Sequence, residues 1–113
     1  MKRYLFGLAF GLLGYAAFSQ APKVLSGPVL GYAEMREALV WLQLTESATV
    51  QIEYWSVKAE NLISKTDPVS TSANTGNTAK LYLRNLEPGE IYDYRVLVNG
   101  DVQNFDFPLS FDT

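Results

Sequence analysis

The sequence contains no cysteine and no histidine among its 113 residues. Without cysteine, the chain can form neither a disulfide framework nor a thiolate metal site. Without histidine, it can form neither a Ser-His-Asp triad nor an imidazole-ligated zinc or iron site. We therefore predict that this chain holds no catalytic residue, no cofactor-binding residue and no metal ligand.

Other catalytic patterns are also missing. No Ser-x-x-Lys motif occurs, and the hydroxyl-rich segment 70–78 has the composition of a solvated loop. Asp101 and Asp106 differ in parity, so in an unbroken strand they face opposite sides. Neither an Asp-x-Asp-x-Asp calcium loop nor a glycine-rich phosphate loop is present. We expect the acidic side chains to lie in solvent.

Runs of positive charge are absent beyond the first residues. Met1-Lys2-Arg3 precedes an apolar stretch, Tyr4 to Phe18, which ends at Ser19. This order predicts a cleavable secretory signal peptide over residues 1–19. The alternative is a membrane anchor, but 15 residues fall short of the ~20 that a spanning helix needs.

Cleavage of the signal peptide would leave an acidic chain. Lys2 and Arg3 would be lost, leaving seven basic side chains against twelve acidic ones. An acidic surface argues against nucleic acid and against anionic membrane as partners. We expect an exported protein, periplasmic or extracellular, that does not bind the membrane after cleavage.

The remaining sequence follows a strand pattern, with no helical period. Residues 20–25 are expected to be a linker, and residues 26–113 to form one domain. Strands are expected at 27–32, 37–45, 48–57, 78–83, 91–98 and 102–112, with an irregular edge strand near 68–71. Asn99-Gly100 predicts a two-residue hairpin, and the last strand is expected to point Phe105, Phe107, Leu109 and Phe111 inward. The prediction is an all-β, immunoglobulin-like or fibronectin type III-like antiparallel β-sandwich of about seven strands.

Three residues are assigned to the structural core. The segment Leu86-Glu87-Pro88-Gly89-Glu90-Ile91-Tyr92 resembles the fibronectin type III turn that carries a tyrosine corner. Trp41 stands where that fold often has a core tryptophan. We assign Trp41, Leu86 and Tyr92 to packing, not to catalysis.

Two strands are apolar on both faces. In Ala38-Leu39-Val40-Trp41-Leu42 neither parity is polar, and Trp55 lies opposite Val50, Ile52 and Tyr54. A sandwich of this size buries one face of each sheet, so a second apolar face suggests a covering partner. We predict an interdomain contact at Val40, Leu42 and Trp55. The alternative is a tryptophan lying flat on its sheet, shielded by a long side chain.

The segment Ser26 to Gln43 carries a family resemblance through Gly27-Pro28, Gly31-Tyr32, Met35-Arg36 and Trp41. This pattern resembles the opening of alkaline phosphatase D-type phosphatases and phosphodiesterases, whose front domain is a fibronectin-like sandwich. Residues 50–55, 78–81, 86–94 and 108–113 continue the resemblance, so it covers nearly all of the chain after residue 19.

The resemblance implies a parent protein with a second, metallophosphatase-type domain. That domain would bind divalent or trivalent metals and hydrolyse phosphate esters, and the present sequence is expected to end where it begins. The chain itself would be its non-catalytic partner within the same parent. Two alternatives remain: a self-standing exported module that binds protein or carbohydrate, and a small exported enzyme.

Overall fold

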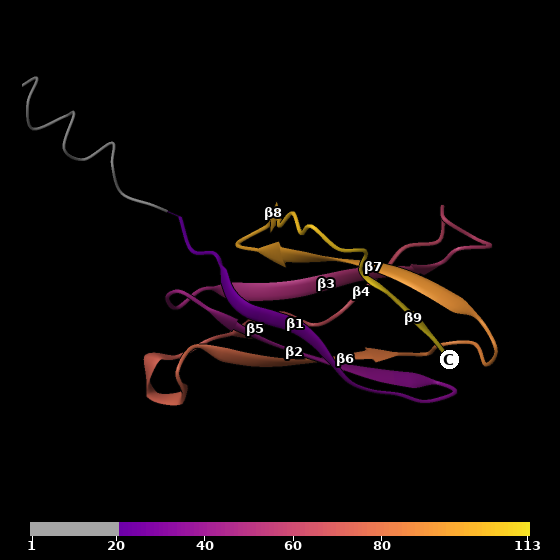
Figure 1. Ribbon diagram of the computed structural model, residues 1–113, viewed down its shortest axis with the longest axis horizontal. Helices are drawn as coiled ribbons and strands as arrows, with labels where there is room; N and C mark the ends of the chain where they lie inside the picture. Colours follow the sequence, from indigo (N-terminus) through magenta and orange to yellow (C-terminus); the bar gives the residue numbers. More distant parts are fainter. Residues whose placement is uncertain (1–20) are drawn as a thin grey trace, which may run out of the picture.

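The computed structural model describes residues 21–113 as two antiparallel β-sheets packed face to face (Figure 1). The first sheet has the order β1-β2-β6, with β1 at Val24–Ala33, β2 at Glu37–Leu44 and β6 at Thr78–Arg84. The all-β antiparallel sandwich predicted from the sequence is thus confirmed. The predicted signal peptide, residues 1–19, lies outside the described residues.

The second sheet is built around two long strands, β3 at Thr49–Ser56 and β7 at Ile91–Val98. Its strand order is β4-β3-β7-β8. In addition, β5 pairs with β3 and β9 pairs with β7. The remaining elements are short: β4 (Ser64–Lys65), β5 (Val69–Ser70), the 3₁₀ turn η1 (Ala73–Thr75), β8 (Asp101–Val102) and β9 (Ser110–Asp112). Three strands therefore face a larger sheet centred on β3 and β7, as in fibronectin type III-like domains.

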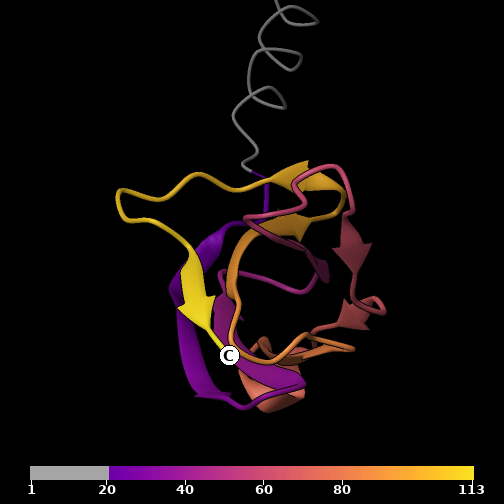
Figure 2. The same cartoon turned by 90° about the vertical axis from the view of Figure 1, so that its right-hand side faces the viewer.

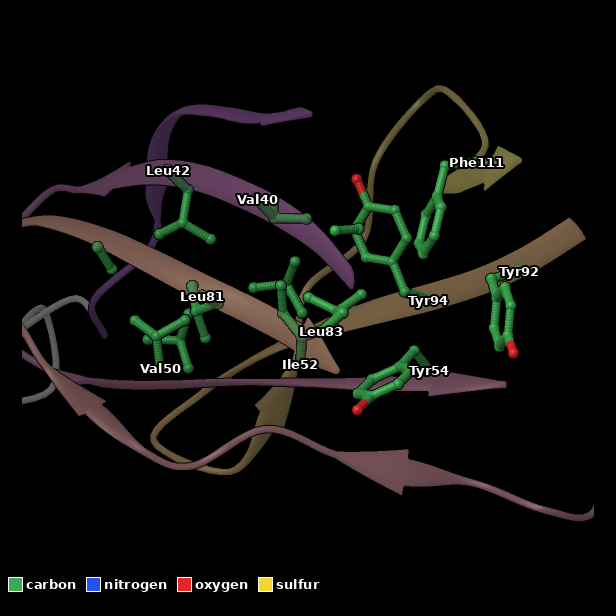
Figure 3. Packing of buried hydrophobic residues seen from close by; sticks show 14 of the residues in the cluster. Val40, Leu42, Val50, Ile52, Tyr54, Leu81, Leu83, Tyr92, Tyr94 and Phe111 are labelled. Carbon is green, nitrogen blue, oxygen red and sulfur yellow. The ribbon is translucent and has the colours of Figure 1, made fainter. Parts of the chain in front are cut away.

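The core fills the space between the sheets (Figure 3). Alternate side chains along each long strand point inward, because the side-chain period of a strand is two residues. The inward residues are Ala38, Val40, Leu42 and Leu44 on β2, Val50, Ile52 and Tyr54 on β3, Ala79, Leu81 and Leu83 on β6, and Tyr92, Tyr94, Val96 and Val98 on β7. Burying one large apolar side chain of this kind contributes roughly 1.5–3 kcal/mol, so this cluster supplies the main driving force for folding.

The alternation on β2 corrects two predictions. Val40 and Leu42 are 0% exposed and pack in the core, so they form no outer contact surface. Trp41 points the other way and is partly exposed, so it is not a core residue. The physical reason is register: Trp41 lies opposite Lys80 on β6, which faces solvent, whereas Val40 lies opposite the buried Leu81.

The first and last strands of the structure have other bounds than the sequence predicts. β1 begins at Val24, inside the segment 20–25 that was expected to be a linker. The predicted last strand is interrupted: residues 103–109 separate β8 from β9 and project as a loop, drawn in yellow in Figure 2. Phe107 is 50% exposed and packs on the Phe105 ring, so the prediction that it points inward is wrong. Pro108 has no N–H for a ladder, which favours a break at this point.

Two predicted turns form as expected. Asn99 and Gly100 have φ values of 50° and 85°, and they join β7 to β8 as a two-residue hairpin. In the β6–β7 turn, the Tyr92 hydroxyl accepts a hydrogen bond of 2.7 Å from the Glu87 N–H. Leu86 and Tyr92 are both buried, so this turn is fixed to the core by a tyrosine corner.

The turns gather at two opposite ends of the sandwich (Figure 1). We call one of them the C-terminal end: it consists of the β1–β2 turn (34–36), the β3–β4 connection (57–63), the β6–β7 turn (85–90) and Thr113. Hydrogen bonds join these segments, from Leu86 N–H to the Arg36 carbonyl and from Val57 N–H to the Ile91 carbonyl. The opposite end holds the turns 45–48, 71–77 and 99–100, which are likewise joined by hydrogen bonds such as that from Asn99 N–H to the Thr49 carbonyl.

Candidate interaction surfaces

Within residues 21–113, neither a cluster of metal-ligating side chains nor a membrane-spanning helix is found. No group of three or more acidic, histidine or cysteine side chains within 21–113 is arranged to hold a metal ion. The described part of the chain also has no helix long and apolar enough to cross a membrane. The family resemblance assigns its divalent or trivalent metals to a separate catalytic domain and not to these residues.

Trp55, the third predicted contact residue, lies on the outer side of β3. The Arg95 guanidinium lies 5.2 Å from the centroid of the Trp55 ring, a cation–π geometry. Arg95 is itself held by Glu53, with 2.7 Å between Nε and Oε1. A long side chain thus covers part of this tryptophan, as in the alternative explanation drawn from the sequence. Trp55 and Leu62 also line a cavity of about 170 Å³ between β3 and the β6–β7 turn.

The outer face of the β1-β2-β6 sheet carries aromatic side chains. Trp41 on β2 lies between Val29 on β1 and Lys80 on β6 in the strand register. Two positions along, Leu39 lies between Tyr32 and Tyr82. We call this surface the outer face, and define it by Val29, Tyr32, Leu39, Trp41, Lys80 and Tyr82. It is apolar at its centre and has polar groups around it.

One border of the outer face is a hydrogen-bonded cluster. Glu37 accepts a hydrogen bond from the Tyr32 hydroxyl and pairs with Arg84 at 3.0 Å, and the Arg84 guanidinium lies 5.1 Å from the Tyr82 ring centroid. The hydrogen bond to Glu37 raises the pKa of Tyr32 to about 12. The same bond, followed by that from Arg84, holds the pKa of Glu37 below its ordinary value. The cluster fixes four side chains that would otherwise move freely at the surface.

The C-terminal end exposes large apolar side chains in its turns. Met35 is 68% exposed and Leu62 is 69% exposed, and the neighbouring Ile63 and Ile91 also reach solvent. Met35 and Pro88 line a hollow of about 740 Å³, together with Glu34, Arg36 and Glu37. Turn positions usually carry small polar residues, so exposed apolar side chains at these places are unusual.

Thr113 is hydrogen-bonded to the β6–β7 turn, at the same C-terminal end. Thr113 donates from its hydroxyl to the Glu87 carbonyl at 2.6 Å and accepts from the Glu90 N–H at 3.0 Å. Its backbone N–H donates to the Glu90 carbonyl at 2.9 Å. Figure 2 looks onto this end, with the C-terminus beside the β1–β2 and β6–β7 turns. A polypeptide that continued past Thr113 would therefore leave the sandwich next to the hollow.

The opposite end has a different composition. Its turns contain serine, threonine, asparagine, glycine and alanine, with Glu46 as the charged residue and no large apolar side chain. They are closed by their own hydrogen bonds, including those from Ser47 to Asn77 and from Thr49 N–H to Asn99 Oδ1. The turns at the two ends thus differ in composition; exposed Leu25 and Val102 lie on strands beside the polar turns.

Sequence reasoning missed the residues at the C-terminal end. The predicted contact residues Val40, Leu42 and Trp55 all lie in strands, and no apolar residue of a turn was among them. The available signal was an apolar residue inside a turn: Met35 between Glu34 and Arg36, and Leu62-Ile63 within the β3–β4 connection. Their common location follows from the tertiary structure, because these turns are far apart along the chain.

The fold is thus a fibronectin-like β-sandwich. Among solved structures, the sensor domain of the anti-sigma factor RsgI4 in Pseudobacteroides cellulosolvens matches with a TM-score of 0.62 at 15% identity, over 82% of this chain and 89% of that chain. PhoD matches with a TM-score of 0.57 at 17% identity, over 74% of this chain and 19% of PhoD. The FN1–FN3 domains of chicken CNTN1 match with a TM-score of 0.52 at 21% identity, over 82% of this chain and 31% of theirs. These likenesses show the fold.

No curated protein matches the sequence. The family described as a domain of unknown function, DUF7800, matches residues 21–107. The chain therefore belongs to the DUF7800 family.

Proposed function

We propose that this chain is the non-catalytic sandwich module of an exported alkaline phosphatase D-type phosphatase or phosphodiesterase. In this proposal, the module packs against a metal-dependent catalytic domain of the same parent protein. That domain would hold the divalent or trivalent metals and hydrolyse phosphate esters. Residues 1–19 would direct export and be removed.

The observation that carries the proposal is the difference between the two ends. The exposed Met35 and Leu62 lie at the C-terminal end, where Thr113 is hydrogen-bonded to the β6–β7 turn. The turns of the opposite end are polar. A module that packs on a following domain needs an apolar surface next to its exit point, because burial of apolar area drives stable contacts between domains. The match to PhoD supports the choice of parent, since it spans most of this chain and a fifth of that protein.

The test begins with the reading frame. It should continue past Thr113 into a segment rich in aspartate, asparagine and histidine. The parent should then hydrolyse a phosphate ester in a metal-dependent manner, and residues 20–113 alone should give the background rate. Deletion of residues 20–113 from the parent should lower activity or stability. Turnover of a phosphate diester by purified residues 20–113, well above background, would overturn the proposal.

A second candidate function is a self-standing exported module that binds protein or carbohydrate. The partly exposed Trp41 and the exposed Tyr82 of the outer face favour it, because aromatic rings are frequent anchors at binding surfaces. The match to the RsgI4 sensor domain covers 89% of that chain, which is a likeness between whole domains.

The second candidate makes a separate prediction. A polysaccharide or protein ligand should change the fluorescence of Trp41, and Trp41→Ala should remove that response while Trp55→Ala keeps it. A panel of soluble polysaccharides is the first probe. A reading frame that ends at residue 113, together with saturable binding, would favour this candidate over the phosphatase module.

A further inference from the structure

The geometry points to the C-terminal end as the surface on which this chain packs against the domain that follows it, and to a partner surface that is apolar with basic side chains around it. The inference rests on the proposed function, because that function supplies the following domain. It goes further in naming the contact surface and the chemistry of the partner.

The location of the last residue is the first argument. Thr113 is held to the β6–β7 turn by hydrogen bonds that include contacts of 2.6, 2.9 and 3.0 Å. This fixes the direction in which the chain would leave the sandwich, beside the hollow lined by Met35 and Pro88. A domain that begins there is held close to this end, so the local concentration of the two surfaces is high and contact is favoured.

Apolar exposure is the second argument. Met35 and Leu62 are the most exposed of the large apolar side chains in the described residues, at 68% and 69%. Both lie in turns of the C-terminal end, on either side of the β6–β7 turn. Methionine and leucine in such positions contribute to binding when they enter a complementary pocket, because their apolar area is removed from water.

Charge is the third argument. Three exposed carboxylates, Glu34, Glu60 and Glu87, lie in the same turns as the apolar side chains, and Arg36 and Lys58 are the basic residues of these turns. The ion pairs among the described residues engage Glu37, Glu53 and Glu90 instead. The border of this surface is therefore acidic, and its complement is a basic border on the partner.

Amide hydrogen exchange tests the location. Exchange is measured on the chain alone and on the full parent protein. The segments 34–36, 57–63 and 85–90 should exchange at least tenfold more slowly in the parent, while 45–48, 71–77 and 99–100 should not change. Slower exchange confined to the opposite end or to the outer face would overturn the inference and leave the proposed function standing. Equal exchange in every segment would mean that the domains do not pack, which contradicts the proposed function itself.

Matched variants of the parent protein test the apolar part. Met35→Ser should speed exchange of the β6–β7 turn about tenfold, since loss of a central apolar contact often has an effect of this size. Val102→Ser is the control, because Val102 is 51% exposed on β8, away from the C-terminal end. It should change exchange less than about twofold. Both residues are exposed, so neither variant should unfold the chain. Equal effects of the two variants would overturn the inference.

Charge reversal tests the border. Glu87→Lys should weaken the contact, and the loss should shrink as salt is raised, because salt screens exposed charges. Glu46→Lys, an exposed glutamate of the opposite end, is the matched control and should leave the contact unchanged. A Glu87→Lys parent with stronger protection of the C-terminal end would show that the partner border is acidic, and would overturn that part of the inference.

Discussion

At the scale of single residues, the hydroxyl groups of buried tyrosines differ in what they hold. The Tyr92 hydroxyl accepts the Glu87 N–H, and the Tyr54 hydroxyl donates to the Arg84 carbonyl at 2.9 Å. The Tyr94 hydroxyl makes no hydrogen bond within residues 21–113, and burial raises the pKa of Tyr94. These rings contribute similar apolar packing, but their hydroxyls have different structural roles.

We predict that Tyr92→Phe lowers the free energy of unfolding by about 1–2 kcal/mol, because the Glu87 N–H loses its acceptor in a part-buried turn. Tyr94→Phe is the control and should change stability by less than about 0.5 kcal/mol. Urea unfolding followed by tryptophan fluorescence measures both. Equal losses for the two variants would show that the tyrosine corner contributes nothing specific.

The Tyr32–Glu37–Arg84 cluster gives the second prediction, a pH dependence. The folded pKa of Tyr32 is raised to about 12, so its contribution is complete below the unfolded value of 10.0 and is lost as pH rises from there towards 12. The folded pKa of Glu37 is lowered, so its contribution is present above the unfolded value of 4.5 and is lost as pH falls through the folded value.

The experiment compares the unmodified chain with Tyr32→Phe. The free energy of unfolding of the unmodified chain should fall more steeply between pH 10 and 12, and the variant should lack this extra slope. Tyr82→Phe is a suitable control, because Tyr82 lies on the same sheet face but does not bond Glu37. Parallel curves for the unmodified chain and Tyr32→Phe would contradict the prediction.

At the scale of elements, β1 is held against β2 by a close backbone approach. Gly27 has a φ of 88°, and a Cβ at this position would lie 2.9 Å from the Trp41 carbonyl oxygen. Gly100 in the β7–β8 hairpin has a similar φ of 85°, but a Cβ there would meet no atom within 4 Å. The two glycines thus share a backbone requirement, and Gly27 adds a steric one.

The third prediction uses this pair. Gly100→Ala should cost about 1 kcal/mol of stability, from the strain of a positive φ alone. Gly27→Ala should cost about 2 kcal/mol or more, since the backbone of β2 must also move. Urea unfolding gives both values, and amide exchange of β1 shows whether this strand detaches. If the Gly27→Ala chain were as stable as the Gly100→Ala chain, β1 would be able to shift relative to β2 at little cost in free energy.

At the scale of the whole molecule, the unequal ends predict self-association of the chain when it is alone. The exposed Met35 and Leu62 should bring two C-terminal ends together at high concentration. The C-terminal ends of the two molecules both carry acidic borders, so they repel each other. Salt screens this repulsion and should therefore strengthen self-association. The contact with a basic partner has the opposite salt dependence.

Sedimentation over a range of concentration and salt measures this fourth prediction. Leu62→Ser should weaken self-association severalfold, and Val102→Ser should not. If the chain stayed monomeric at all protein and salt concentrations, the exposed apolar side chains of the C-terminal end would not drive association. Association that is unaffected by Leu62→Ser but reduced by Trp41→Ala would place the contact on the outer face instead.

Local patterns in the sequence were sufficient to predict the fold class, most strand positions and two of the turns. Alternation in β3 and β7, the Asn99-Gly100 hairpin and the Leu86-to-Tyr92 turn are local patterns, and a local pattern is sufficient where one face is polar or a turn requires special φ values. The absence of cysteine and histidine is likewise a property of the composition.

Which face of β2 is buried, and which turns lie together, depends on how the strands pair. Every residue from Ala38 to Leu42 is apolar, so the sequence carries no parity signal there; the pairing of Trp41 with Lys80 and of Val40 with Leu81 settles it. Met35, Leu62 and Thr113 are distant along the chain and lie at one end of the sandwich because antiparallel strands bring alternate turns to the same end. A surface made of separate turns exists once the sheets have packed, since no single segment contains it.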